Sequence, residues 1–526
     1  MKRRLTTQLY LPLILGLAAL MRLWRLTAKP LWVDELYTAF YSLGKNLSEI
    51  PTDTLLAPEG YWALLDNPGS PWQAAQALTT HSNHPPLFFM AMNSWLQGTG
   101  VSVWSLRGFA VLWGVVGVAG VFYLGQRVAG PRVGILSALL MAVSPYGIYL
   151  SQEARHYSVA VAIAIFALYH WIALLQGDRS LRHWLSWIGL NALGLYIHYF
   201  YSFTVIAQWL VTIARLLWRQ KHRQQTLGWL LAMGTTLLLY LPWLPTAVVH
   251  FQKEGGTNWL SQSTPIWQTV IMPWLQSLVA GVFMVILLPV EQVPQWVVIV
   301  SAITMLLVFG VIIWQLNRGW QLDSRLDLWS PLVSYGLGVF GLMLAITYGL
   351  GKDLTLAPRY FFMVYPAVTV IAALAMARRR RWVCVVAIAA GLISQLFISY
   401  DIALLKSYLP GQVGRRLGAD NQPTIALIAP QRNSYRARVL SYVLAIPPEK
   451  DNIQVAFTEP ATTEPWQPTL TNSEIIPVEN LILWLVEPQR QAPFPPTVIL
   501  PNQTCSPIGE RIKTEGTRQQ KYQCLG

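Results

Sequence analysis

Charged residues are scarce in this chain. Only 12% of its 526 residues are Asp, Glu, Lys or Arg, whereas 54% are hydrophobic and 24 are Trp. Water-soluble domains carry about 25% charged residues, and a large core does not account for so great a deficit. The composition therefore predicts an integral membrane protein and excludes an ordinary soluble domain.

Cysteine and nucleotide-binding motifs are scarce or missing as well. Three cysteines are too few for a disulfide scaffold or a Cys-rich metal site. Cys384 lies in an apolar run, while Cys505 and Cys524 lie in a hydrophilic tail, where they either pair or stay unpaired. The sequence has no P-loop, no zinc-type Cys or His spacing and no Gly-rich dinucleotide motif, which argues against soluble nucleotide chemistry.

Acidic residues are outnumbered, 24 Asp and Glu against 38 Lys and Arg. The basic excess falls in residues 1–400, in short clusters between apolar runs. A nucleic-acid-binding protein would gather such residues on one soluble face, so we expect no nucleic-acid partner. Clusters of this kind are typical of the cytoplasmic loops of a multi-pass membrane protein.

Eleven apolar runs are long enough to cross a bilayer of about 30 Å as helices. They lie near residues 5–24, 106–125, 133–151, 157–175, 183–199, 201–218, 226–248, 295–316, 330–350, 360–377 and 382–400. Two less certain runs, 85–97 and 267–289, raise the range to 11 to 13. We interpret these two as interfacial or re-entrant helices on the outer side, because a single crossing by either would invert every later loop.

Placing the N-terminus in the cytoplasm puts most basic clusters inside, as the positive-inside rule requires. The tail from residue 401 is then extracytoplasmic. We therefore predict an all-α membrane domain over 1–400, with a long first outer loop at 25–105 that contains interfacial helices, and a small C-terminal α/β domain over 401–526. In that tail we expect strands at 424–429, 453–457 and 481–487 and a helix at 434–445.

The polar residues within the apolar part gather on one side of the membrane. Their positions at outer ends of spans or in outer loops suggest a site that opens there, because ionisable groups near lipid are costly. The candidates are Asp34, Glu35, His84, Glu153, Arg155, His156, Tyr157, His198, Tyr199 and Arg359, together with Arg22 at the outer end of the first span.

Each candidate has a chemical interpretation and a simpler one. Asp34 would accept a proton or bind a divalent cation, or it is a hydrated loop acid. His84 would bind a phosphate oxygen, or it only begins a helix before Pro85 and Pro86. Arginines at span ends such as Arg155 bind lipid phosphate bidentately, or they extend along apolar surface to reach water.

Several segments resemble the GT-C membrane glycosyltransferases, in particular the bacterial relatives of protein O-mannosyltransferases (glycosyltransferase family 39) and of the lipid A aminoarabinose and lipopolysaccharide core sugar transferases. The matching segments cover residues 15–370 in the family's order, and the tail lies outside them. They are the Arg22-Leu pair before LWVDEL, NHPPLFF, RGFAVLWGVVGVAGVFYLGQRVAG, SPYGIYLSQEARHYS, YIHYF and APRYFFMVYPA.

The resemblance implies an enzyme of the plasma (inner) membrane that uses a polyprenyl-phosphate sugar donor. Its acceptor would be a lipid, a glycan or a protein on the extracytoplasmic face. Asp34 matches the family's catalytic base or metal-site acid, and Glu153 is the second catalytic candidate. The other candidates match positions that line the donor and acceptor cavity. Use of Mg²⁺ or Mn²⁺ stays open, because the second outer loop lacks an Asp-x-Asp motif.

A transporter or flippase of lipid-linked sugars is the main alternative. Such proteins usually carry polar groups at the bilayer midplane, on broken helices within repeated halves. This sequence shows no such repeat, and its spans are apolar at their centres. A non-catalytic scaffold is a third possibility, which the one-sided gathering of acid, imidazole and guanidinium groups disfavours.

Overall fold

The computed structural model divides the chain into two compact units. Unit 1 contains residues 1–26, 78–95 and 104–403, and unit 2 contains residues 27–77, 96–103 and 404–526. The structure describes residues 2–219, 223–253, 260–261, 265–320, 330–378, 381–403, 408–429, 436–458, 480–487, 493–500, 503–514 and 517–525. We had expected all of 25–105 to belong with the membrane domain, but most of this loop groups with the C-terminal tail.

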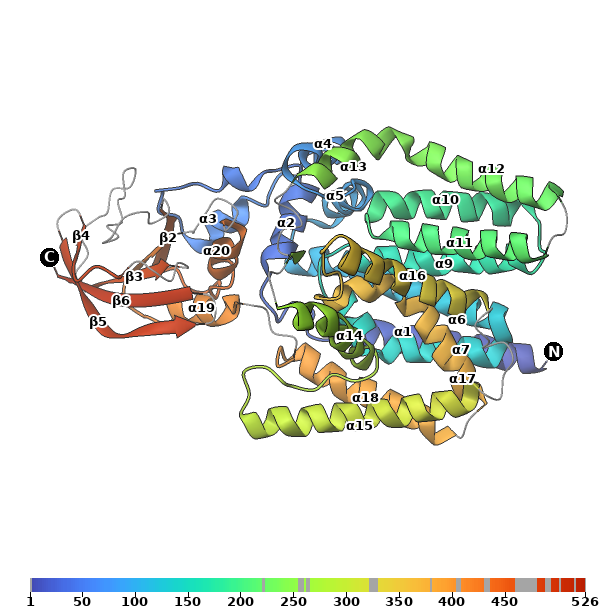
Figure 1. The fold of residues 1–526 in the computed structure, drawn as a ribbon. Helices are drawn as coiled ribbons and strands as arrows, with labels where there is room; N and C mark the ends of the chain where they lie inside the picture. Colours follow the sequence, from blue (N-terminus) through green and yellow to red (C-terminus); the bar gives the residue numbers. More distant parts are fainter. Residues whose placement is uncertain are drawn as a thin grey trace. The chain divides into compact units, whose positions relative to one another are not determined.

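Unit 1 is a bundle of helices (Figure 1). The element bounds are α1 (Lys2–Leu23), α5 (Leu87–Thr99), α6 (Val103–Ala129), α7 (Pro131–Val143), α8 (Pro145–Ser151), α9 (Tyr157–Leu175), α10 (Leu181–Ile197), α11 (Tyr201–Arg219), α12 (Arg223–Tyr240), η2 (Leu241–Trp243), α13 (Leu244–Gln252), α14 (Ile266–Phe283), α15 (Gln295–Trp320), α16 (Pro331–Gly349), η6 (Pro358–Met363), α17 (Tyr365–Ala377) and α18 (Arg381–Ser399).

Eight helices in the described ranges are long and apolar enough to cross a membrane, or nine if the bent pair α7 and α8 is one span. The helix α14, within a run that we expected at the membrane surface, meets the same criteria. The other uncertain run, 85–97, forms α5, which has only 13 residues. The protein is thus a multi-pass membrane protein, while the count of 11 to 13 crossings stays a prediction.

The break between α7 and α8 has a local cause and a tertiary one. Pro145 has no N–H, so it cannot continue the hydrogen bonding of α7, and the two helices meet at 60°. The freed carbonyls of Met141 and Ala142 accept hydrogen bonds from the Arg22 guanidinium at 3.1 and 3.0 Å. A buried arginine therefore satisfies carbonyl groups that the bend leaves without helical partners.

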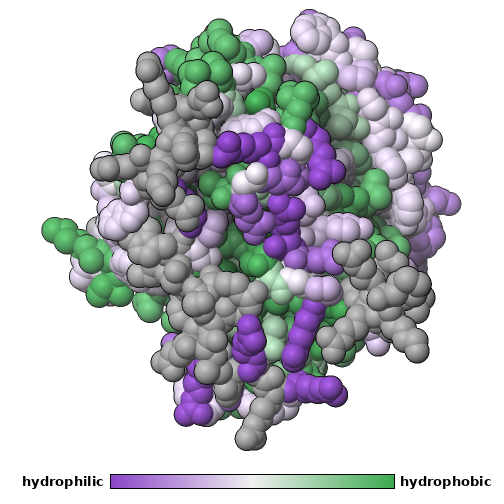
Figure 2. Space-filling model, turned by 90° about the vertical axis from the view of Figure 1, so that its right-hand side faces the viewer, coloured by the Kyte–Doolittle hydropathy of each residue, from purple (hydrophilic) through white to green (hydrophobic). Residues whose placement is uncertain are grey.

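Hydrophilic side chains gather at the end of unit 1 where the chain begins (Figure 2). In the connection between α9 and α10, Asp178 lies 3.7 Å from Arg127 and accepts from Nε2 of His183 at 3.0 Å. The apolar sides of the helices between the two ends are exposed, as on α15, where Ile303 and Leu307 are more than half exposed. Such a distribution is expected of helices that face lipid.

Unit 2 contains a six-stranded mixed sheet in the order β2-β1-β3-β6-β5-β4. Its strands are β1 (Thr424–Ile428), β2 (Ile453–Phe457), β3 (Leu481–Glu487), β4 (Val498–Leu500), β5 (Gln503–Thr514) and β6 (Thr517–Leu525). β1 pairs in parallel with β2 and β3, and the other pairings are antiparallel. The three strands predicted from the sequence are present, whereas β4, β5 and β6 were not foreseen.

Short helices complete unit 2. They are α2 (Val33–Ser42), η1 (Leu47–Glu49), α3 (Pro58–Ala63), α4 (Pro71–His81), which ends in unit 1, α19 (Pro410–Leu417) and α20 (Arg436–Val443). The predicted helix at 434–445 corresponds to α20. Leu56 forms a backbone bridge with Val455, and the backbone N–H of Asp53 donates to the carbonyl of Phe457. The first loop therefore covers the edge strand β2. This arrangement protects a sheet edge that would otherwise offer unpaired backbone groups.

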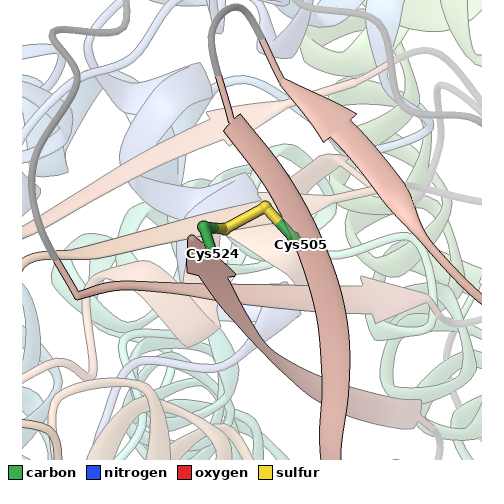
Figure 3. The surroundings of a disulfide bond; sticks show 2 residues. All are labelled: Cys505 and Cys524. Atoms are coloured by element: carbon green, nitrogen blue, oxygen red, sulfur yellow. A yellow bond between two sulfur atoms is a disulfide. The ribbon is translucent and has the colours of Figure 1, made fainter. Parts of the chain in front are cut away.

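Cys505 and Cys524 form a disulfide between β5 and β6 (Figure 3). The two residues lie directly opposite each other in the antiparallel register, and both side chains are buried. The sequence left open whether these two cysteines pair or stay unpaired, and in the structure they pair.

Candidate active site

Three histidines from three segments of unit 1 lie side by side. His84 precedes α5, His156 precedes α9, and His198 follows α10. The ring centroids of His84 and His156 are 5.4 Å apart, and those of His156 and His198 are 4.4 Å apart. Segments distant in sequence thus bring three predicted site residues into one cluster, which we call the histidine cluster.

Hydrogen bonds fix the orientation of two of these rings. Nη2 of Arg155 lies 3.2 Å from Nε2 of His84, and Nδ1 of His84 lies 2.8 Å from Oγ of Ser82. Because a guanidinium only donates, Nε2 of His84 is the acceptor and Nδ1 carries the proton. Nδ1 of His198 accepts from the N–H of Phe200 at 2.9 Å, so its proton resides on Nε2.

Burial and positive neighbours keep the central imidazoles neutral. The pKa of His156 is lowered well below its usual value, first by burial and then by His198, Arg155, His84 and Arg359. The pKa of His198 is lowered well below its usual value by burial and then by His84 and Arg155. The positive charge of the cluster therefore comes from its arginines, while the imidazoles offer neutral donors and acceptors.

His156 is the most enclosed member of the histidine cluster. Its side chain is 0% exposed, and within the described residues neither ring nitrogen has a hydrogen-bond partner. Phe88 packs against it with centroids 5.6 Å apart, and Tyr157 does so at 4.7 Å. A buried imidazole without partners costs free energy, which marks this position as one where stability is not the only constraint.

The remaining predicted residues of unit 1 fall into two groups. Arg359 faces the cluster closely enough to lower the pKa of His156, and Tyr157 packs against His198 at 5.6 Å. Glu153 is buried in the same connection as Arg155, and its carbonyl accepts the Arg155 N–H at 2.7 Å. Arg359 and Tyr157 thus lie with the histidine cluster, whereas Glu153 is linked to it only through the backbone of Arg155. The roles assigned to all three residues stay predictions.

Arg22 and Tyr199 are placed elsewhere. Arg22 is 1% exposed and is bound to backbone carbonyls and to Ser151, so its role in the structure is to hold the break between α7 and α8. The hydroxyl of Tyr199 lies 2.7 Å from Nδ1 of His250 and accepts from Trp243 Nε1 at 3.2 Å. Neither contact involves the histidine cluster.

Asp34 and Glu35 belong to unit 2, in the first turn of α2. Glu35 is buried, and its Oε2 accepts the N–H of Trp32 at 3.3 Å, so this carboxylate helps to begin the helix. Asp34 lies near Tyr408, whose pKa it helps to raise. The catalytic role assigned to Asp34 stays a prediction.

Sequence reasoning missed two aromatic residues of the site, although both lie in motifs that it identified. Phe88 of NHPPLFF packs against His156, and Phe362 of APRYFF packs against Tyr157 and His198 at 5.7 and 5.0 Å. In each motif, a pair of Phe residues lies within four or five residues after the polar residue. The side on which such an aromatic lies is decided by packing and cannot be read from the motif.

An apolar cavity of about 460 Å³ lies next to the 3-10 helix η6. Helices α7, α14, α15, α16, α17 and α18 also contribute to its walls, mostly with aliphatic and aromatic side chains. Phe361 lines this cavity, and its neighbour Phe362 packs on the histidine cluster. η6 therefore connects a positively charged polar cluster with an apolar cavity in the same unit.

The histidine cluster does not fit a divalent cation. Nε2 of His84 faces the Arg155 guanidinium, and Nδ1 of His198 accepts a backbone N–H. A cation beside Arg155 would be repelled, and the lone pairs of His84 Nε2 and His198 Nδ1 are already engaged. Across the described part of the chain, no group of three or more His, Cys, Asp or Glu residues is arranged to hold a metal ion.

Known proteins resemble this chain in part of its sequence and in its fold. Residues 83–245 match the family model described as dolichyl-phosphate-mannose-protein mannosyltransferase. The structure resembles that of ArnT from Cupriavidus metallidurans bound to undecaprenyl phosphate, with a TM-score of 0.52 and 11% identity over 97% of both chains. The chain thus resembles this mannosyltransferase family over residues 83–245 and shares the fold of ArnT.

The apo state of the same ArnT gives a second structural match. Its TM-score is 0.52 with 10% identity, over 99% of this chain and 98% of that one. At such low identity the likeness concerns the fold. No curated protein matches the sequence. The family-model match includes His84, Glu153, Arg155, His156 and His198, so the histidine cluster lies within the matched region.

Proposed function

We propose that the protein is a glycosyltransferase that moves a sugar from a polyprenyl-phosphate-linked donor to a hydroxyl group of a lipid, glycan or protein acceptor. The observation that carries the proposal is the junction at η6, where a cluster with Arg155 and Arg359 adjoins an apolar cavity. The cluster suits the phosphate of such a donor, and the cavity suits part of its hydrocarbon chain. The match to a mannosyltransferase family model supports the same reaction class.

Transfer in this proposal is a single displacement at the anomeric carbon. The acceptor oxygen forms a bond to that carbon while the bond from the carbon to the phosphate oxygen breaks. The hydroxyl proton passes to the Asp34 carboxylate, and the bonding electrons leave with the phosphate, which gains one negative charge. The configuration of the sugar is inverted.

The groups of the histidine cluster stabilise the leaving phosphate. Arg155, which is buried, and Arg359, which is partly buried, supply positive charge where electrostatic stabilisation is stronger than in water. Nε2–H of His198 is a neutral donor in the same cluster. Glu153 is the second acid that we assign to the site, adjacent in sequence to these donors.

We further propose that the reaction occurs on the extracytoplasmic face of the plasma (inner) membrane. The chain crosses the membrane an odd number of times, 11 or 13, from a cytoplasmic N-terminus to an extracytoplasmic C-terminal domain. The distribution of basic clusters supports this orientation. A disulfide in the C-terminal domain is consistent with an oxidising compartment.

The test is sugar transfer by purified protein in liposomes that contain a polyprenyl-phosphate sugar. We expect wild-type activity, its loss in Asp34→Asn, and its retention in Glu59→Gln, a control that removes an exposed carboxylate from the same loop. Equal activity of wild type and Asp34→Asn would remove Asp34 from the mechanism. Translocation of the lipid-linked sugar without transfer would instead identify a flippase.

A further inference from the structure

The helix that carries Asp34 begins with a hydrogen bond to the C-terminal tail. The N–H of Val33, the first residue of α2, donates to the hydroxyl oxygen of Tyr408 at 2.6 Å. The first amides of a helix have no partner within the helix, and a side-chain oxygen of the N-cap residue usually accepts from one of them. The N-cap here is Trp32, whose indole only donates. Tyr408, 375 residues farther along the chain, supplies the missing acceptor.

Tyr408 is itself held firmly within unit 2. Its side chain is 2% exposed, its ring meets that of Tyr442 edge-on at 5.9 Å, and the Arg438 guanidinium lies 4.5 Å from its ring centroid. Arg438 also donates to the hydroxyl of Tyr442 at 3.0 Å. Both partners belong to α20, which packs against α2. The hydroxyl oxygen of Tyr408, which accepts from the first amide of α2, therefore has little freedom to move.

Tyr408 is also near the carboxylate that follows Val33. Burial raises the pKa of Tyr408 well above its usual value; the hydrogen bonds with the Val33 N–H and Ser441 lower it in part, and the neighbouring Tyr442 and Asp34 raise it. The phenol therefore remains protonated at any physiological pH. Its oxygen orients the turn that carries Asp34 and adds no charge of its own.

Further contacts tie the rest of this loop to the tail. Nη1 of Arg436 donates to the carbonyls of Ser48 and Ile50, both at 3.4 Å. The hydroxyl of Tyr61 donates to the carbonyl of Val455 at 3.0 Å, next to the bridge between Leu56 and Val455. Loop residues that follow α2 are thus anchored on α20 and β2, so α2 is held at both of its ends.

We propose that Tyr408 is a positioning residue for Asp34 and that the C-terminal domain serves the transfer reaction by fixing the first turn of α2. This inference rests on the proposed function, in which Asp34 is the base. It gives the tail a role that neither its sequence nor the family-model match assigns. A base displaced by about 1 Å can lose about a hundredfold in rate, so one hydroxyl is enough to matter.

The experiment compares two variants that each remove one buried phenolic hydroxyl. Tyr408→Phe removes the acceptor of the Val33 N–H, whereas Tyr442→Phe leaves that hydrogen bond in place. Rates are expressed per site that binds the donor phosphate, so that any unfolded fraction is excluded. We expect kcat of Tyr408→Phe to fall about 10- to 100-fold with an unchanged KM for the donor, and kcat of Tyr442→Phe to stay within about twofold of wild type.

Hydrogen exchange supplies a readout that does not depend on activity. Amides of residues 33–42 should exchange faster in Tyr408→Phe than in wild type or in Tyr442→Phe. Equal kcat for the two variants, or unchanged exchange in Tyr408→Phe, would overturn the inference. If Asp34→Asn were fully active, the proposed base would fail instead, and the exchange experiment would still decide whether Tyr408 holds α2.

Discussion

Nη2 of Arg155 lies 3.2 Å from Nε2 of His84, so a guanidinium and a neutral imidazole form one unit at the centre of the candidate site. Substitution Arg155→Gln should weaken binding of a polyprenyl phosphate about 10- to 100-fold, because a hydrogen bond from a charged group contributes about 1.5–3 kcal/mol. The dissociation constant, measured by calorimetry in detergent, checks this expectation. The control is Arg127→Gln, which removes an arginine paired with Asp178 and should leave binding unchanged.

The histidine cluster should make stability depend on pH. His156 and His198 have pKa values well below the unfolded value of about 6.5, so the unfolded chain binds more protons below pH 6.5. Stability is therefore complete above pH 6.5 and falls on acidification, by about 1.4 kcal/mol per pH unit for each histidine that stays neutral. Thermal unfolding between pH 7.5 and 5 should show this fall, and His156→Phe should reduce it.

An anion bound in the cluster should reverse part of that dependence. A phosphate near His156 favours its protonated form, so a lipid phosphate should stabilise the protein more at pH 5.5 than at pH 7.5. The increase in melting temperature on adding the lipid, compared at the two pH values, is the measurement. A larger increase at pH 7.5 would show that the phosphate binds away from the imidazoles.

The cavity beside η6 should set the preference for lipid chain length. A Cβ atom at Gly281 would lie 3.5 Å from the ring of Phe309, so the side chain of Gly281→Leu would occupy the cavity. We expect this variant to bind a long-chain polyprenyl phosphate at least about tenfold more weakly, with little change for a short-chain analogue. Gly310→Leu adds the same side chain where nothing lies within 4 Å and is the matched control.

Arg22 should matter for stability and not for donor binding. Substitution Arg22→Met leaves the carbonyls of Met141 and Ala142 without their donor, which should cost about 3 kcal/mol or more. A lower melting temperature, with normal donor affinity in the folded fraction, is the expected result. Loss of affinity in folded Arg22→Met would return this residue to the substrate-binding role predicted from the sequence. Arg25→Met, at a more exposed arginine, is the control.

The disulfide should stabilise the C-terminal domain. Cys505 and Cys524 close a loop with a sequence separation of 19, for which chain entropy gives about 3 kcal/mol. Replacement of both cysteines by Ser should lower the melting temperature by a similar amount as reduction does. If the two treatments left it unchanged, the hairpin of β5 and β6 would hold without the bond.

The candidate site was predictable mainly where a motif and an apolar run occur together. His84, Arg155, His156 and His198 were identified because polar residues at the ends of apolar runs share one membrane face, and the structure brings them into one cluster. Their mutual order was not predictable, since ring contacts depend on how α5, α9 and α10 pack. The same limit applies to Arg22, which resembles a headgroup arginine in sequence but binds carbonyls freed by a helix break.

In the C-terminal tail, too, some elements were predictable from the sequence and others were not. The strands β1, β2 and β3 are continuous apolar runs, and their sequences predicted them. β5 and β6 carry many charged and polar residues, some of them at buried positions, so their sequences lack the apolar–polar alternation that predicts a half-buried strand. The attachment of residues 53–56 to β2 involves backbone hydrogen bonds, which leave no trace in side-chain type.

The sequence by itself determined that the chain is a multi-pass membrane protein with a polar cluster at the ends of its helices, because bilayer thickness and the cost of charge in lipid act on composition and spacing directly. Only the tertiary structure decided which arginine faces the imidazoles and which one binds the carbonyls at the break between α7 and α8. It also decided that the Tyr408 hydroxyl accepts from the first amide of the helix that carries Asp34. Those outcomes depend on contacts between segments up to 375 residues apart, where many partners are chemically equivalent and only packing selects among them.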